Sequence, residues 1–136
     1  MEFTQVVQNR YSCKKFDGRP VEKAQLEAIL EAGRLAPTAK NLQEQRIYVI
    51  QSEAILEKLD QVTPCRYNAS TVIVVAFDKN NVFTYPGGQR DSGVEDATIV
   101  ATHMSLAVDA SRKNYETSDL FAIEIIIENV ISTYNR

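Results

Sequence analysis

The chain has 136 residues, of which 44% are hydrophobic and 24% are charged, a balance that excludes intrinsically disordered and fibrous proteins. Its formal net charge of −3 at pH 7 excludes the general basic field that draws a protein onto nucleic acid, so any anion-binding site has to be local. At this length we expect one domain, covering residues 1–136.

The sequence also argues against a membrane protein, a secreted protein and a metalloprotein. No apolar run reaches the roughly 20 residues that span a bilayer, and Met1–Val7 lacks the basic and apolar regions of a signal peptide. Cys13 and Cys65 are too few and too far apart for a disulfide framework, and neither has cysteine or histidine neighbours that would complete a zinc site. We therefore expect a cytoplasmic protein without a bound metal.

The first third of the chain predicts two helices. Apolar residues in Phe3–Val7 have helical spacing, which predicts a short helix that delivers the chain to Arg10. Between Pro20 and Pro37 the apolar residues recur with a helical period, and a proline stands at each end. This segment is therefore predicted to be an amphipathic helix that ends just before Pro37.

Two strands and a helix are predicted next. Arg46–Ile50 has the composition of a strand, and Ser52 is placed to cap a helix that runs to Val62. The β-branched run in Thr71–Phe77 is unbroken, which predicts a central strand buried on both faces, with helices above and below it. Residues 78–92 are a loop by composition.

A long helix is predicted to begin near Ser92 or Gly93 and to continue through Val108. Apolar residues occupy much of its circumference, which is typical of a buried central helix. Glu95 and Asp96 are acidic residues of the kind that suits the first turn of a helix.

The C-terminal segment Leu120–Ile131 is compatible with two structures, a helix entered at Ser118 or Asp119 and a strand rich in isoleucine. Its length and the placement of Glu124 and Glu128 four residues apart favour the helix.

A short basic motif follows the first predicted helix, in Arg10–Phe16. It contains a guanidinium, a hydroxyl and an ammonium within five residues, at Arg10, Ser12 and Lys14. An arginine can bind a phosphate through two hydrogen bonds while a lysine adds a mobile charge, so the motif is a candidate phosphate site. Taken alone, such a cluster is more commonly a solvated surface.

A second motif, Ala36–Gln43, follows the amphipathic helix. Its small residues expose backbone groups, and its two side-chain amides, at Asn41 and Gln43, both donate and accept hydrogen bonds. These groups could form hydrogen bonds with the edge of an isoalloxazine ring, which carries both donors and acceptors. Taken alone, the motif is equally an ordinary loop that ends a helix, with amides bonded to backbone or water.

The two motifs in this order, joined by a helix and followed by a strand, resemble the nitroreductase family of FMN-dependent oxidoreductases. The similarity lies in the following stretches: Arg10–Phe16, Phe16–Val21, Ala32–Pro37, Asn41–Gln43, Arg46–Val49, Thr71–Phe77 and Val94–Leu106. It implies an α/β (α+β) fold in which helices flank a central mixed β-sheet, and an interlocked homodimer with FMN at the subunit interface.

The resemblance also implies the residues that would bind FMN, with two subunits contributing to each flavin. From one subunit, the phosphate and ribityl chain would be held by Arg10, Ser12 and Lys14, with a backbone or ring contact from Tyr11. From the other, the isoalloxazine would be lined by Pro37, Thr38, Ala39 and Asn41, with Gln43 as a neighbour. Arg66 is a possible further contact. No catalytic side chain is expected, because the flavin itself carries the hydride chemistry.

The sequence departs from the family pattern after Ala110. The glycine-rich turn, the proline-containing loop and the final basic pair that the family normally shows are not visible, so the chain resembles a short or C-terminally truncated member. Two main functions remain open, beside a flavin enzyme on the same scaffold that would carry out dehalogenation or flavin cleavage. The first is hydride transfer from NAD(P)H through FMN to a nitroaromatic or quinone. The second is that of a catalytically impaired relative, which acts as a flavin- or nucleotide-binding protein or as a scaffold dimer.

Overall fold

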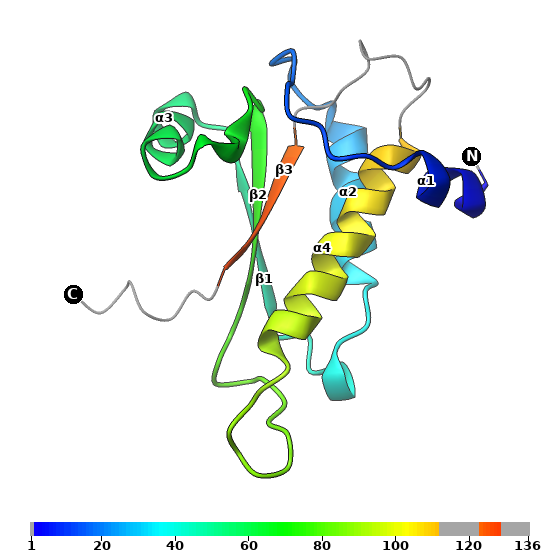
Figure 1. Ribbon diagram of the computed structural model, residues 1–136, viewed down its shortest axis with the longest axis vertical. Coiled ribbons are helices and arrows are strands. Elements are labelled where there is room, and N and C mark those ends of the chain that lie inside the picture. The colour runs from blue at the N-terminus through cyan, green and yellow to red at the C-terminus, as the bar shows by residue number, and fades with distance from the viewer. Residues whose placement is uncertain (1, 112–122, 129–136) are drawn as a thin grey trace.

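The computed structural model describes residues 2–111 and 123–128, in which three strands form one sheet and four α-helices pack around it (Figure 1). The α-helices are α1 (Phe3–Asn9), α2 (Lys23–Arg34), α3 (Glu53–Val62) and α4 (Gly93–Ala110). The strands are β1 (Gln45–Ile50), β2 (Thr71–Phe77) and β3 (Ile123–Glu128), and two short 3-10 helices are η1 (Ala39–Asn41) and η2 (Pro64–Arg66). The elements predicted between residues 3 and 110 are confirmed.

The sheet is mixed and has the order β1-β2-β3. Strand β1 runs antiparallel to β2, with Gln45 opposite Phe77, and β2 runs parallel to β3, with Thr71 opposite Ile123. The parallel pair is connected through α4, as parallel neighbours require a crossover. The predicted α/β class with a central mixed sheet is confirmed.

The prediction of a helix in the C-terminal segment is wrong, because Ile123–Glu128 forms strand β3. Glu124 and Glu128 are four residues apart, and four is close to the helical period but is also a multiple of the strand period of two, so this spacing could not distinguish the structures. The β-branched isoleucines decide for the strand once the edge of β2 is available for pairing. The other residues of the predicted segment lie outside the described ranges.

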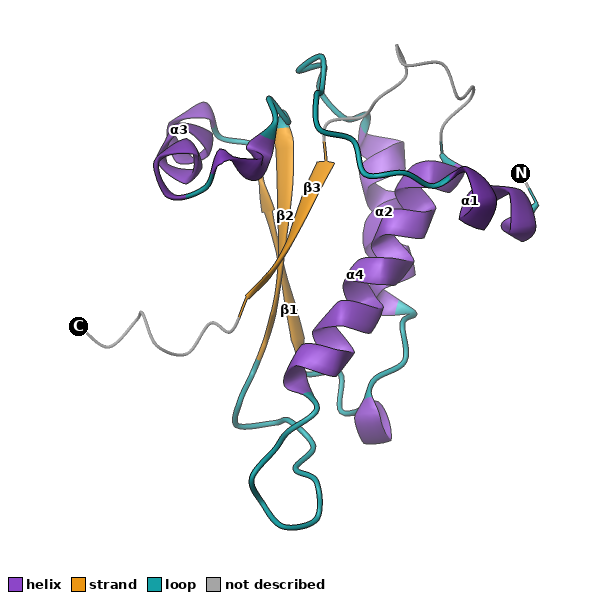
Figure 2. Ribbon diagram, viewed as in Figure 1, coloured by secondary structure: helices purple, strands orange, loops and turns teal. Residues whose placement is uncertain are grey.

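Strand β2 is covered unequally on its two faces. Helices α2 and α4 run along one face, whereas α3 lies on the opposite side and only near one end of the sheet (Figures 1 and 2). The prediction of helices above and below β2 therefore holds along the whole of one face and at one end of the other. All residues of β2 are buried except Val74, which is half-buried.

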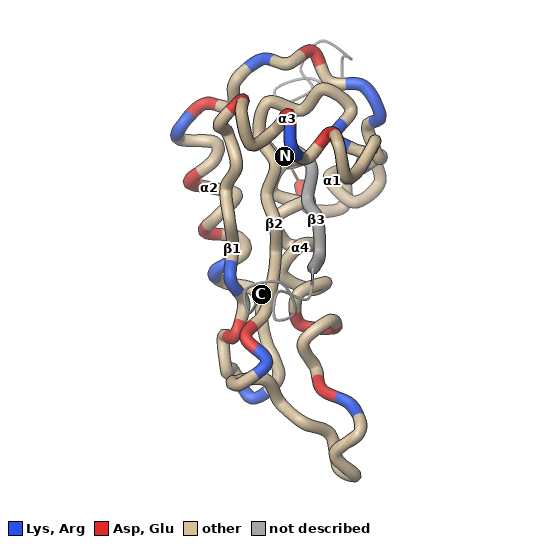
Figure 3. Tube along the Cα trace, turned by 90° about the vertical axis from the view of Figure 1, so that its left-hand side faces the viewer, with Lys and Arg blue, Asp and Glu red and all other residues tan. Residues whose placement is uncertain are grey.

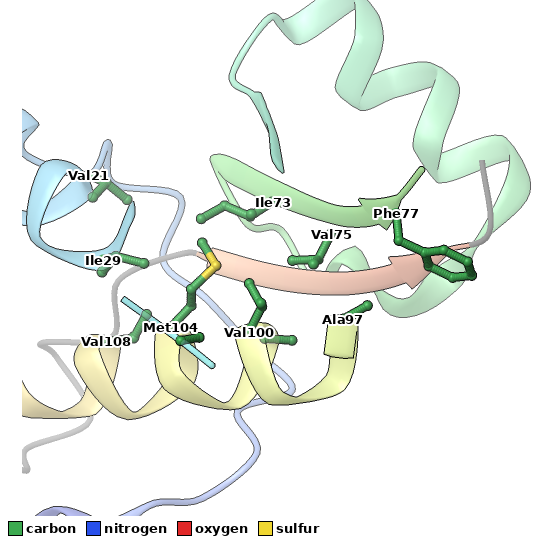
Figure 4. Close-up of a cluster of buried hydrophobic side chains, with 11 residues drawn as sticks. Val21, Ile29, Ile73, Val75, Phe77, Ala97, Val100, Met104 and Val108 are labelled. Atoms are coloured by element: carbon green, nitrogen blue, oxygen red, sulfur yellow. The ribbon is translucent and has the colours of Figure 1, made fainter. Parts of the chain in front are cut away.

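The main core lies between β2 and the two long helices (Figure 4). Ile73 and Val75 point from β2 toward Val100 and Met104 of α4, and Ile29 joins them from α2. Each such side chain contributes roughly 1.5–3 kcal/mol to stability when fully buried. The trace along β2 carries no charged residue, whereas charged residues lie along α2 and in the loops at the two ends of the molecule (Figure 3).

Close packing of α2 on α4 depends on a glycine. A Cβ atom added at Gly33 would lie 2.8 Å from Sδ of Met104, so a larger residue here would require the Met104 side chain to shift. Among the helices in the described ranges, none is long and apolar enough to cross a membrane.

Candidate functional site

The basic motif lies in the loop that leaves α1. Arg10 ends the helix in an extended conformation, and the side chains of Arg10, Tyr11, Ser12 and Lys14 are all exposed. Phe16 turns inward and is buried, and its backbone N–H donates to the carbonyl oxygen of Tyr67 at 3.0 Å. The loop therefore presents its cations to solvent while its apolar residue anchors it.

The segment that precedes β2 holds this loop in place. The amide nitrogen of Asn68 donates to the carbonyl oxygen of Phe16 at 3.3 Å, and the Ser70 hydroxyl donates to the carbonyl oxygen of Arg19 at 2.6 Å. Asn68 has a φ of 68°, in the left-handed region that asparagine tolerates better than most residues. These contacts tie the basic loop to a segment about 50 residues away in the sequence.

Arg66, a possible flavin contact from the sequence, takes part in the protein's own structure. Its guanidinium forms an ion pair with Asp60 and donates to the carbonyl oxygen of Ala69 at 2.8 Å. The hydrogen bond from Arg66 lowers the pKa of the Asp60 carboxyl below its ordinary value. These bonds explain the position of the segment before β2 without a ligand.

The second motif forms a tight loop around η1, and its two amides lie side by side. The side-chain nitrogen of Gln43 donates to the side-chain oxygen of Asn41 at 3.1 Å, and the backbone N–H of Gln43 donates to the Thr38 hydroxyl at 3.0 Å. Pro37, Asn41 and Gln43 are exposed. Thr38 and Ala39 are half-buried. This hydrogen bond uses the side-chain nitrogen of Gln43 and the side-chain oxygen of Asn41. The side-chain oxygen of Gln43 and the side-chain nitrogen of Asn41 are therefore available to a ligand.

The backbone of this loop is strained. Lys40, Asn41 and Gln43 have φ values of 53°, 54° and 52°, in the left-handed region that costs a non-glycine residue of the order of 1–3 kcal/mol. Such a conformation persists only where neighbouring contacts impose it. Asn81 supplies one of them, because its side-chain nitrogen donates to the carbonyl oxygen of Leu42 at 3.1 Å. The ammonium of Lys40 lies 4.8 Å from the centre of the Phe83 ring and supplies another.

Two buried carboxyl groups lie beneath the loop, and sequence reasoning missed their role. Asp96, in the first turn of α4, accepts hydrogen bonds from the Ala39 backbone N–H at 2.9 Å and from the Ser92 hydroxyl at 2.5 Å. Glu44, which directly follows the motif, is fully buried beside it. Burial, followed by the influence of the neighbouring Asp96 carboxyl, raises the pKa of Glu44 to about 7. The sequence places Asp96 correctly on the helix, but no local pattern shows that it holds the loop.

The two motifs lie at opposite ends of α4 within one chain (Figures 1 and 2). The loop 37–43 contacts the first turn of α4 through Asp96, whereas the basic loop follows α1 near the other end of that helix. An 18-residue helix is about 27 Å long. Within one chain the structure therefore does not bring Arg10, Ser12 and Lys14 together with Asn41 and Gln43.

Helix α4 also presents apolar side chains to solvent. Val94 is 55% exposed and Ile99 is 37% exposed, and Thr98, Thr102 and His103 are exposed beside them. Between Asp96 and Asp109 the helix has no aspartate, glutamate, lysine or arginine. A helix whose outer face is uncharged and carries exposed apolar side chains is typical of one that a further element covers.

Comparisons with known proteins find similarity to nitroreductases in both sequence and structure. The model of the nitroreductase family matches residues 7–66, which include both motifs. A crystal structure of a nitroreductase family protein from Clostridium difficile 630 is 37% identical and superposes with a TM-score of 0.76, over 81% of this chain and 63% of that chain. Residues 7–66 thus match the nitroreductase family, and the described fold is similar to that of solved nitroreductases. The matches extend from the two motifs to the sheet and helices described above.

Two further relatives define how much of a nitroreductase the chain spans. MhqN of Bacillus subtilis (strain 168), named as an NAD(P)H nitroreductase, is 35% identical over 82 residues, which are 57% of this chain and 40% of MhqN. A nitroreductase from Bacteroides fragilis with bound FMN is 21% identical with a TM-score of 0.68, over 81% of this chain and 65% of that chain, and shows the shared fold. The chain thus spans about two fifths of MhqN and less than two thirds of these solved nitroreductases.

Proposed function

We propose that this chain forms a homodimer that binds FMN at its interface, and that it passes a hydride from NADH or NADPH to a small electron-poor acceptor such as a nitroaromatic or a quinone. The names of relatives support the cofactors: one structure is of a nitroreductase with bound FMN, another is named an FMN-dependent nitroreductase, and MhqN is named for NAD(P)H. We place this activity in the cytoplasm, as the sequence analysis predicts. Bound FMN would supply the hydride chemistry.

The side chains at the two loops have the chemistry that FMN requires. Arg10 and Lys14 are exposed cations in a loop whose backbone is anchored by Phe16, so they could bind the phosphate without rearrangement of the chain. Ser12 adds a hydroxyl for the ribityl chain, and Tyr11 adds a backbone group or ring beside it. The donor set fits the phosphate end of the cofactor.

The loop 37–43 has the groups for the ring. Pro37, Thr38 and Ala39 offer small side chains and backbone groups, and Asn41 and Gln43 offer an amide nitrogen and an amide oxygen. Donors near one edge of an isoalloxazine favour its reduced, partly anionic form, an electrostatic contribution that needs no acid, base or nucleophile. We therefore assign no catalytic side chain to the chain.

The single observation that carries the dimer proposal is the separation of the two loops along α4. One FMN can contact both loops only if they come from different copies, and the uncharged outer face of α4, with Val94 and Ile99 exposed, gives the two copies a surface on which to pair. Burial of Val94 and Ile99 in such a pairing would also explain why these side chains face outward.

Mixing two variants tests this arrangement. The first variant combines Arg10→Ala with Lys14→Ala, and the second combines Asn41→Ala with Gln43→Ala. Each should bind FMN at least about tenfold more weakly than the unmodified protein, because each loses charge-assisted or neutral hydrogen bonds to the cofactor. Co-expression with two different affinity tags then gives a heterodimer that can be purified away from both parents.

In a shared site, the heterodimer contains one intact flavin site and one doubly damaged site. It should therefore bind one FMN per dimer with the affinity of the unmodified protein, measured by quenching of flavin fluorescence. If each site were built within one chain, neither site of the heterodimer would be intact and no tight binding would return. A dimer of the unmodified chain that binds no FMN would instead support the scaffold function.

A further inference from the structure

We propose that Glu44 is a positioning residue, and that a proton held between its carboxyl and that of Asp96 keeps the loop 37–43 in the conformation that binds the flavin. The inference rests on the proposed function for the identity of the ligand. The coupling between proton and loop is a property of the chain itself and can be measured without a ligand.

The position of Glu44 is unusual for a charged side chain. It stands between the exposed loop residue Gln43 and the first residue of β1, and its relative exposure is 0%. Neither of its carboxyl oxygens has a hydrogen-bond donor among the residues that the structure describes. A charged carboxylate without donors is strongly disfavoured in such a place, whereas a protonated carboxyl can donate one hydrogen bond.

Asp96 is the acceptor for the hydrogen bond that a protonated Glu44 would donate. Its carboxylate already accepts from Ala39 and Ser92, and it stands in the first turn of α4, where the helix dipole favours a negative charge. Of the two neighbouring carboxyls, Asp96 is therefore the one that keeps its charge and Glu44 the one that takes the proton, as in other carboxyl pairs with unequal surroundings.

The other charged groups around Glu44 do not neutralise it. Asp91, in the loop before α4, adds a further negative charge. Asp78 follows β2 and donates its backbone N–H to the carbonyl oxygen of Glu44, and Arg46 of β1 donates to that same carbonyl and pairs with Asp78 at 3.4 Å. The Arg46 cation thus serves the backbone of Glu44 and a different carboxylate.

The loop is connected to this pair through Ala39. The Ala39 N–H bonds to Asp96, and Ala39 begins the three-residue turn that contains the left-handed residues Lys40 and Asn41. Ionisation of Glu44 would place two carboxylates side by side in a buried site, and they would separate. Movement of Asp96 would release Ala39 and with it the contact that helps to hold the strained loop.

The surroundings of Glu44 put this change near neutral pH. Burial contributes most, and the neighbouring carboxyls of Asp96 and Asp91 add to it, so that the pKa of Glu44 is raised to about 7. If only the protonated form binds FMN, the affinity should fall about tenfold between pH 6 and pH 8, since apparent affinity follows the fraction of protein in the competent state.

The variant Glu44→Gln is the matched probe, because a glutamine has nearly the same shape and donates permanently to Asp96. Glu57→Gln is its control, since Glu57 is an exposed residue of α3 on the other side of the sheet. His103→Gln removes the one histidine of the chain.

The first measurement follows the Ala39 backbone amide of the full chain by NMR from pH 5 to pH 9, without ligand. We expect one titration with a midpoint near pH 7 in the unmodified protein, in Glu57→Gln and in His103→Gln, and no such titration in Glu44→Gln. A resonance that is unchanged over this range in the unmodified protein would overturn the inference, and this result does not depend on whether any variant folds.

The second measurement is the dissociation constant of FMN at pH 6 and pH 8. The ratio of the dissociation constant at pH 8 to that at pH 6 should be about tenfold larger for the unmodified protein than for Glu44→Gln. Comparing the two proteins also cancels the titration of the FMN phosphate itself. Tight binding with equal ratios in the two proteins would overturn the inference and leave the proposed function standing. An Ala39 titration without any FMN binding would overturn the proposed function and leave the proton coupling standing.

Discussion

The ring of Phe77, the last residue of β2, lies directly against the backbone of Gly93, the first residue of α4. A Cβ atom added at Gly93 would stand 2.1 Å from Cε2 of this ring, far inside van der Waals contact. The absence of a side chain at this position lets α4 begin on top of the end of β2. This contact places Ser92 and Asp96 under the loop 37–43, so a single glycine links the core to the candidate site.

Gly93→Ala should destabilise the protein by about 1–3 kcal/mol, because the added methyl group has to displace a buried ring. Denaturant unfolding monitored by circular dichroism measures the effect. In a Phe77→Leu background the same substitution should cost clearly less, since the smaller side chain makes room. Equal costs in both backgrounds would mean that the Phe77 ring is not the obstacle.

The pH dependence of stability should carry the signature of Glu44. Its folded-state pKa is raised from 4.5 to about 7, so between these values the folded protein holds a proton that the unfolded chain releases. The free energy of unfolding should therefore fall as pH rises through this window, by about 3 kcal/mol in total. Urea unfolding at intervals between pH 4.5 and pH 8 measures the slope.

Glu44→Gln should remove this fall, and the difference between the two profiles should level off above about pH 7. The carboxyls of Asp60 and Glu31 act in the opposite direction, because hydrogen bonds from Arg66 and Arg34 lower their pKa values. Their contributions are lost only as pH falls below ordinary values of 3.8 and 4.5. A profile of the unmodified protein that rises between pH 5 and pH 7 would contradict the assignment.

The anchor of the basic loop can be separated into a hydrogen bond and a backbone preference. Asn68→Gly keeps the left-handed φ of 68° accessible but removes the amide that bonds Phe16, whereas Asn68→Ala removes the amide and strains the backbone. We expect losses of about 1 kcal/mol for the hydrogen bond and a further loss of about 1 kcal/mol for alanine. Thermal unfolding of both variants measures the two steps, and equal stabilities would show that the backbone conformation costs nothing here.

Met104→Ala should be among the most damaging single truncations in α4. Met104 is fully buried between α2 and β2 and lies against Gly33, so its removal leaves a cavity and should cost about 2–5 kcal/mol. Ile55→Ala in α3 is the control, since Ile55 is 47% exposed and its truncation should cost below about 1 kcal/mol. Similar losses for the two variants, measured in guanidinium chloride, would place the core elsewhere.

Local patterns were sufficient for the elements whose periodicity was unambiguous. The helical spacing between Pro20 and Pro37 and the unbroken β-branched run of Thr71–Phe77 both correspond to the elements observed. The segment 123–128 was assigned wrongly, because isoleucines with charges four residues apart satisfy a helix and a strand equally. Only the free edge of β2 decides between them.

The sequence by itself determined the chemistry of the candidate site: which loops carry cations and amides, and which family they resemble. The tertiary structure alone decided that these loops stand at opposite ends of α4, and that Glu44 and Asp96 meet beneath one of them. Residue type and local spacing are properties of short segments, whereas burial and the pairing of distant carboxyls arise only when β1, β2 and α4 pack together. The environment that sets the charge of Glu44 is created by residues about 50 positions away, and no local pattern contains it.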